Sequence, residues 1–177
     1  MPTTEAIDTQ LLDLGLLAVR VVFGLVYAAH GAQKLFGWFG GYGIAGTGGF
    51  LETLGFRPGK TFATAAGLGE FLGGLLLALG FLGPVGPALM VAGMIVAMIT
   101  VHRKNKFFVA TNGIEHALMF TTVAVGLALT GPGRYSLDAA LGKTWLETPT
   151  ITWIILAVGV VGGLLNLALR RAPPARV

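Results

Sequence analysis

Apolar residues form five long runs along this chain, and short segments rich in glycine, proline or basic residues separate them. The runs cover about residues 14–36, 61–82, 87–101, 114–130 and 149–169. An α-helix rises about 1.5 Å per residue, so about 20 apolar residues cross a hydrocarbon core of about 30 Å. The third run is short for that thickness. The pattern predicts an all-α integral membrane protein, a four-helix transmembrane bundle plus a fifth C-terminal transmembrane helix.

The composition supports a membrane protein over a soluble one. Apolar residues make up 54% of the chain and charged residues 11%, whereas a soluble domain has about 25% charged residues. The net charge is +4, but the basic residues lie in loops and at the end of the chain, which disfavours a nucleic-acid surface. The chain has no cysteine, so dithiol chemistry and thiolate metal sites within it are excluded.

The segments outside the first four runs have different compositions. Residues 1–13 form an acidic tail, expected to be frayed, and residues 37–60 a glycine-rich aromatic loop at the membrane surface, with a helical turn or two at 49–54. Part of this loop, GYGIAG, matches GxGxxG, but no strand precedes it, so dinucleotide binding is disfavoured.

Residues 14–142 would form the core, 143–170 a connector and fifth helix, and 171–177 a basic cytoplasmic tail.

The distribution of Lys and Arg predicts the orientation, because cytoplasmic loops carry an excess of basic residues. One side of the membrane would hold nine Lys and Arg residues, and the opposite side would hold only Arg134 and Lys143. We therefore expect the N-terminus outside and the C-terminus in the cytoplasm of a bacterial inner-membrane protein. No basic residue precedes Arg20, so the first run is expected to be a retained anchor and not a signal peptide. The cytoplasmic side would hold Lys34, Arg57, Lys60, Arg103, Lys104, Lys106, Arg170, Arg171 and Arg176.

The first run carries a stripe of polar and aromatic residues on one helical face. At about 100° per residue, the members of this stripe fall within an arc of about 100°. Ionisable groups in hydrocarbon are costly, so they normally face partners, water or a functional site. Glu70 lies inside the second run at a comparable depth, and we therefore expect an Arg20–Glu70 ion pair, either as a structural clamp or as a reactive pair. The stripe consists of Arg20, Phe23, Tyr27, His30 and Lys34.

Polar residues near the cytoplasmic ends of the predicted helices suggest one vestibule. Apolar walls with a few convergent polar groups suit a small amphipathic ligand such as a quinone headgroup. We expect His30 and Glu70 to handle protons as the catalytic pair. The ligand-binding candidates are Arg20, Tyr27, Lys34, His102, Glu115 and His116.

Several of these residues have structural alternatives. Glu115 stands three residues after Asn112, as in a capping box. His102 suits the end of a helix, and Lys34 could extend to the interface. A metal or haem bound by His30, His102 and His116 is disfavoured, because no HxxxH or HExxH spacing is present.

Several ordered motifs between residues 14 and 142 resemble the DoxX family of bacterial membrane proteins. They are RVVFGLVYAAHGAQKLFG from Arg20, GLGEFLGG around Glu70, VH ending at His102, EHAL from Glu115 and GPGRYSLD ending at Asp138. The resemblance implies a four-helix core whose polar set is Arg20, His30, Lys34, Glu70, His102 and Glu115. The family is similar to the DoxD subunit of thiosulfate:quinone oxidoreductases, which implies a redox association. The fifth run departs from this core, lacks ionisable residues and is expected to pack peripherally or to serve homo-oligomerisation.

Three functions remain open from the sequence. The first is a redox-associated protein, such as an oxidoreductase subunit, whose cytoplasm-facing pocket binds a quinone or a small sulfur species. The second is a non-catalytic scaffold that recruits soluble redox or oxidative-stress enzymes to the basic cytoplasmic loops. The third is a small-solute or proton-coupled transporter, although the polar groups are biased to one side.

Overall fold

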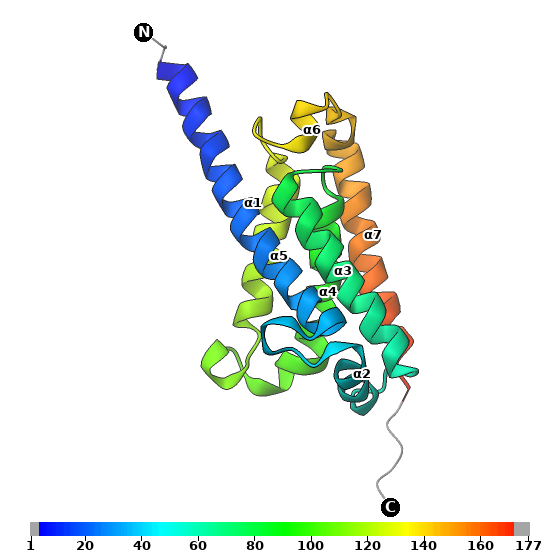
Figure 1. Cartoon of the computed structure of the whole chain (residues 1–177). Coiled ribbons are helices and arrows are strands. Elements are labelled where there is room, and N and C mark those ends of the chain that lie inside the picture. Colours follow the sequence, from blue (N-terminus) through cyan, green and yellow to red (C-terminus); the bar gives the residue numbers. More distant parts are fainter. Residues whose placement is uncertain (1–3, 172–177) are drawn as a thin grey trace, which may run out of the picture.

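The computed structural model describes residues 4–171, and these form helices and turns with no strand (Figure 1). Residues 172–177, where most of the predicted basic tail falls, lie outside the described residues. The α-helices are α1 (Thr4–Phe36), α2 (Gly43–Thr53), α3 (Gly59–Leu79), α4 (Val85–Ala97), α5 (Glu115–Thr130), α6 (Leu137–Ala140) and α7 (Pro149–Ala168). The shorter turns are η1 (Trp38–Gly40), η2 (Met98–His102), η3 (Arg103–Asn105), η4 (Val109–Thr111) and η5 (Thr144–Glu147).

The membrane-spanning helices agree with the hydropathy pattern. Among the described residues, four helices are long and apolar enough to cross a bilayer: Asp8–Phe36, Gly59–Leu79, Val85–Asn105 and Pro149–Ala168. Helix α5 is apolar but shorter. The third predicted run, which is short by itself, is lengthened because η2 is a π-helical segment that continues α4 without a break. The predicted all-α membrane fold is confirmed.

Glycines bring α1 and α3 into backbone contact. A Cβ atom at Gly24 would lie 2.6 Å from the carbonyl oxygen of Gly74, and one at Gly31 would lie 2.3 Å from the amide nitrogen of Phe71. Any larger residue would therefore push the two helices apart. Small residues allow this close approach, and the van der Waals packing that it permits contributes to helix association in a bilayer. The contact fixes which side chains of α1 face α3 further along both helices.

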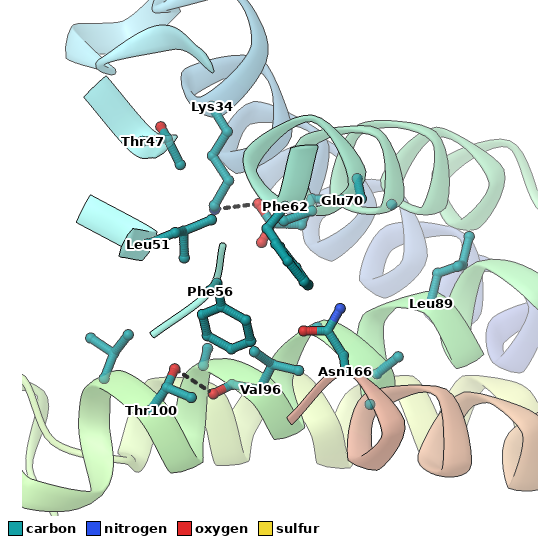
Figure 2. Close-up of a pocket in the computed structure, with 18 of the residues that line it drawn as sticks. Lys34, Thr47, Leu51, Phe56, Phe62, Glu70, Leu89, Val96, Thr100 and Asn166 are labelled. Atoms are coloured by element: carbon teal, nitrogen blue, oxygen red, sulfur yellow. Dashed lines mark hydrogen bonds and ion pairs between the residues drawn. The ribbon is translucent and has the colours of Figure 1, made fainter. Parts of the chain in front are cut away.

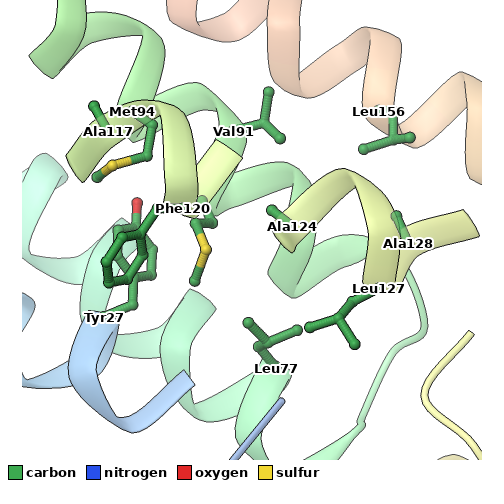
Figure 3. Close-up of a cluster of buried hydrophobic side chains, with 11 residues drawn as sticks. Tyr27, Leu77, Val91, Met94, Ala117, Phe120, Ala124, Leu127, Ala128 and Leu156 are labelled. Atoms are coloured by element: carbon green, nitrogen blue, oxygen red, sulfur yellow. The ribbon is translucent and has the colours of Figure 1, made fainter. Parts of the chain in front are cut away.

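The apolar core lies between α1, α3, α4 and α5, with one contribution from α7 (Figure 3). Tyr27 and Met90 are fully buried there, and the ring of Phe120 packs edge-on against Phe23 at 5.2 Å. Helix α7 packs along α4 and places Leu156 in this core. Leu156 is the one residue of α7 in this core and most apolar side chains of α7 are exposed, which agrees with the expected peripheral packing, and the role in homo-oligomerisation stays a prediction.

Two predictions for the loops are corrected by the structure. The N-terminal tail is not frayed throughout, because α1 already begins at Thr4 and Asp13 is buried, where its Oδ1 accepts a hydrogen bond from the amide of Arg134 at 3.0 Å. The glycine-rich segment forms the eleven-residue helix α2, which is longer than the predicted turn or two. The GxGxxG match lies across the start of α2, with no strand before it.

Buried charged groups hold together the end of the bundle that contains α6. Asp138 is fully buried, and its two carboxylate oxygens accept hydrogen bonds from the amides of Leu82 at 3.1 Å and Gly83 at 2.6 Å. The Arg20 guanidinium donates to the carbonyl oxygens of Ala78 and Tyr135. These contacts tie α1, the end of α3 and the α3–α4 turn to α6 and to the segment before it. We call this set, Arg20, Ala78, Leu82, Gly83, Tyr135 and Asp138, the end clamp.

The predicted Arg20–Glu70 ion pair is wrong. Arg20 instead donates to a carbonyl in the last turn of α3, where helical carbonyl groups lack intrahelical partners. Because the Arg20 guanidinium donates to backbone carbonyl groups, it does not pair with the Glu70 carboxylate, which has a different partner.

We predict that Asp138→Ala lowers the free energy of unfolding by about 2–4 kcal/mol, because it removes the fully buried carboxylate to which two half-buried amides donate. Denaturant unfolding of the purified protein in detergent measures the change. Asp8→Ala is the matched control, since Asp8 lies exposed on α1 and should leave the stability unchanged. Equal stability of Asp138→Ala and Asp8→Ala would contradict the role of the clamp.

Candidate functional site

The candidate site is a cavity of about 370 Å³ at the end of the bundle opposite the end clamp. Residues of α1, α2, α3, α4, η2 and α7 line it, together with the segment between α2 and α3. Its walls are mainly apolar, as Figure 2 shows for Leu51, Phe56, Phe62, Leu89 and Val96. A chamber of this size is at the lower end of the range for sites that bind small molecules.

A charged pair forms one polar part of this cavity. The Lys34 ammonium of α1 donates to Glu70 Oε2 of α3, and both side chains line the cavity (Figure 2). The Glu70 side chain is 10% exposed and that of Lys34 is 29% exposed. The pair replaces the predicted Arg20–Glu70 pair. It arises because the close α1–α3 contact turns Lys34, and not Arg20, towards the middle of α3.

Other polar groups of the cavity come from three further places. The Tyr27 hydroxyl donates to the carbonyl oxygen of Leu89 at 3.2 Å, and buried Thr100 donates to that of Val96 at 2.8 Å. Asn166 of α7 points its amide into the cavity (Figure 2) and makes no side-chain hydrogen bond within the described chain. An amide that faces an apolar chamber without a protein partner is free to bind a ligand.

Helix α2 and the loop that follows it lie over the cavity at the end of the bundle opposite the end clamp. We call this the basic end, because exposed Lys and Arg residues such as Lys60, Lys104 and Arg170 lie there. Phe56 in this loop is 1% exposed and lines the cavity. The end of α7 holds the loop in place, since Arg170 Nε donates to the carbonyl of Leu54 and the Arg171 amide donates to that of Gly55, both at 2.9 Å. The cover is partial, because Phe50 of α2 also lines the cavity and is 50% exposed.

The structure brings together Tyr27, Lys34, Glu70 and His102 around the cavity and places the other four candidates outside its lining. His30 lies beside His116, with ring centroids 5.6 Å apart, and both rings contact Phe120. His30 Nδ1 is 3.2 Å from Gln33 Oε1. These two histidines form an aromatic cluster between α1 and α5.

The two remaining candidates bind backbone groups. Arg20 belongs to the end clamp, and Glu115 Oε2 accepts a hydrogen bond from the amide of Val109 at 2.7 Å. The expected capping box with Asn112 is absent, because the residue that caps α5 is Ile114 and it makes no side-chain cap. Glu115 instead stabilises the loop before α5.

The lining residues that the sequence analysis did not single out include Thr47, Phe56, Thr100 and Asn166. Only Asn166 carried a usable signal, as a lone amide within the apolar fifth run. Among residues 4–171, no group of three or more His, Asp or Glu side chains is arranged to hold a metal ion.

Comparisons with known proteins place the chain among membrane proteins. The sequence model of the DoxX family matches residues 15–103. The chain is 34% identical to "Inner membrane protein YqjF" of Escherichia coli (strain K12) over 139 residues, which is 75% of this chain and 96% of that protein. It is 29% identical to "Putative oxidoreductase CatD" of Bacillus subtilis (strain 168) over 131 residues, 74% of this chain and 90% of that protein. No solved structure matches the chain.

A double-mutant cycle tests the Lys34–Glu70 pair. We expect Lys34→Met and Glu70→Gln each to destabilise the protein, because each leaves the other charge buried without a partner. The double variant removes both charges, so it should lose less stability than the sum of the two single losses. The coupling free energy should be about 0.5–3 kcal/mol. Unfolding in detergent measures it, and a cycle of Lys34→Met with Asp8→Asn is the additive control. Additivity in both cycles would contradict the pair.

Proposed function

The chain belongs to the DoxX family and is a multi-pass membrane protein of the bacterial inner-membrane type, and from this premise we propose that it is a redox-associated protein that binds a quinone in its cavity. The observation that carries the proposal is a charged pair set in an otherwise apolar chamber within the bundle. The name of the Bacillus subtilis relative, an oxidoreductase, agrees with a redox role.

A quinone headgroup fits the chemistry of the lining. Its ring is flat and apolar and matches the aromatic and aliphatic walls, where Phe56 and Phe62 pack at 5.2 Å from each other. Its carbonyl oxygens accept hydrogen bonds, and the cavity offers donors in the Lys34 ammonium and the Asn166 amide. A charged donor forms the stronger of these bonds.

Reduction of a quinone to a hydroquinone needs two electrons and two protons. We assign proton transfer to Glu70, which lines the cavity, and to His102, which lies at its edge close to the surface loops. His102 Nδ1 is 2.9 Å from the carbonyl oxygen of Asn112 in such a loop. The chain contains no cysteine, so we assign the electron supply to a reduced partner protein or a bound cofactor.

Equilibrium binding of dimethoxy-methyl-benzoquinone, a ubiquinone analogue without a tail, tests this function. We expect the purified protein to bind it, and Lys34→Met to weaken binding about tenfold, the effect of losing one charged hydrogen bond of about 1.4 kcal/mol. Asp8→Asn should bind as the wild type does. Absence of binding to the wild type, or equal affinity of a folded Lys34→Met protein, would contradict the proposal.

A second candidate function is favoured by the charge at one end of the bundle. The exposed basic residues there come from the loop before α3, the first turn of α3, the segment after η2 and the residues that follow α7. This end is the predicted cytoplasmic side. We propose it as the surface that a soluble redox enzyme would contact. Those residues are Arg57, Lys60, Arg103, Lys104, Arg170 and Arg171, with Lys106 beside them.

Neutralising the loop between η2 and η4 distinguishes the two functions. The triple variant Arg103→Gln, Lys104→Gln and Lys106→Gln should bind the tail-less quinone normally, because none of the three residues lines the cavity. If the protein is a scaffold, the same variant should lose a soluble oxidoreductase that the wild type retains after crosslinking in membranes. Identical recovery of that enzyme with both proteins would contradict the scaffold role of this loop.

A further inference from the structure

Helices α3 and α7 lie on either side of the cavity without packing on each other. Each packs along α4, but contacts between α3 and α7 are almost absent in the described chain. Both helices still contribute to the cavity lining. The two helices are therefore held apart by α4 along this flank of the bundle.

Small residues line this flank. Ala65 and Gly69 on α3 and Gly162 on α7 all belong to the cavity lining, and Ala65 and Gly162 are exposed at the surface. A Cβ atom at Gly69 or at Gly162 would meet no atom within 4 Å. The same residues thus border both the cavity and the outside of the bundle, which makes the flank an opening.

The opening lies at the depth of the hydrocarbon core. At about 1.5 Å per residue, Ala65 and Gly162 are each about 9 Å, and Gly69 about 15 Å, inside the ends of their helices at the basic side. Both helices are long and apolar enough to span the membrane. Lipid chains, and not water, therefore surround the opening.

At the basic end, the Phe56 loop and α2 lie over part of the cavity, and Phe50 of α2 both lines the cavity and is 50% exposed. This cover is fixed to α7 by the two hydrogen bonds from Arg170 and Arg171. The expected vestibule open to the cytoplasm stays a prediction, and the open flank is a second way into the cavity.

We infer that the gap between α3 and α7 is a lateral portal, through which a ligand with a hydrocarbon tail enters the cavity from the bilayer. The polar headgroup reaches Lys34 and Glu70, while the tail stays in the portal between Gly69 and Gly162. A cavity of about 370 Å³ holds a headgroup but not a long tail as well. The identity of the headgroup rests on the proposed function, whereas the portal rests on the geometry alone.

Bulky residues in the portal test whether the hydrocarbon tail of the ligand occupies it. We expect the double variant Gly69→Leu, Gly162→Leu to weaken the binding of decylubiquinone about tenfold or more, and to change that of the tail-less quinone far less. Gly126→Leu is the matched control, since Gly126 on α5 also has free space for a side chain and does not line the cavity. Loss of both quinones alike, or unchanged binding of decylubiquinone, would overturn the inference.

A spin label tests the portal without any quinone. The chain has no cysteine, so Ala66→Cys in the cavity wall can be labelled alone and reconstituted in phospholipid vesicles. We expect its spectrum to be relaxed by oxygen as strongly as that of Leu68→Cys, which is exposed on α3 outside the cavity lining. A water-soluble nickel chelate should relax Lys104→Cys but not Ala66→Cys.

Relaxation of the Ala66→Cys label by the nickel chelate, with weak relaxation by oxygen, would overturn the portal. If the label reports lipid while no quinone binds, the portal stands and the proposed function fails. The two measurements therefore separate the route from the identity of the ligand.

Discussion

The backbone contact between α1 and α3 is the constraint on which the rest of this structure depends. Gly24 and Gly31 on α1 allow it, and Gly74 completes it on α3. Helices in a bilayer gain no hydrophobic free energy by associating, so close packing of small residues has to supply the attraction. Once the two helices are fixed at this distance, the position of every polar side chain along their shared face follows.

Two basic residues of α1 illustrate that consequence. Arg20 lies near the end of α3 and binds carbonyl groups, so it belongs to the end clamp. Lys34 lies fourteen positions further along, at the other end of the contact, and binds Glu70. One end of the bundle is thereby closed by buried hydrogen bonds, and the other contains a chamber with a charged pair. The division assigns stability to one end and ligand chemistry to the other.

The sequence predicted the spans well, because hydropathy over about 20 residues reports burial in lipid directly. It failed for the partner of Glu70, because depth along two helices does not determine which faces meet. The relevant contact is set by Gly24, Gly31 and Gly74, and the pattern of polar residues does not indicate these positions. Other glycines of α3 serve elsewhere, since Gly73 packs against Leu89 of α4 and Gly69 borders the cavity.

The sequence also identified the polar residues of α1, α3 and α5, but it did not predict which of them lie together. Residue types suggested one vestibule, yet His30 and His116 stack beside Phe120 outside the cavity lining. Asn166 is the reverse case. It lies within an apolar run of the fifth helix, and only the packing of α7 along α4 brings its amide into the chamber.

We propose that Lys34 in this chamber binds the carbonyl group of a quinone. Infrared difference spectra of a quinone labelled with a heavy carbon isotope at its carbonyl groups test this contact directly. We expect the stretching band of one labelled carbonyl to move to lower frequency on binding to the wild-type protein, and this displacement to disappear in Lys34→Met. A band that matches the free quinone in an apolar solvent, or the same displacement in both proteins, would show that Lys34 does not bind the carbonyl group.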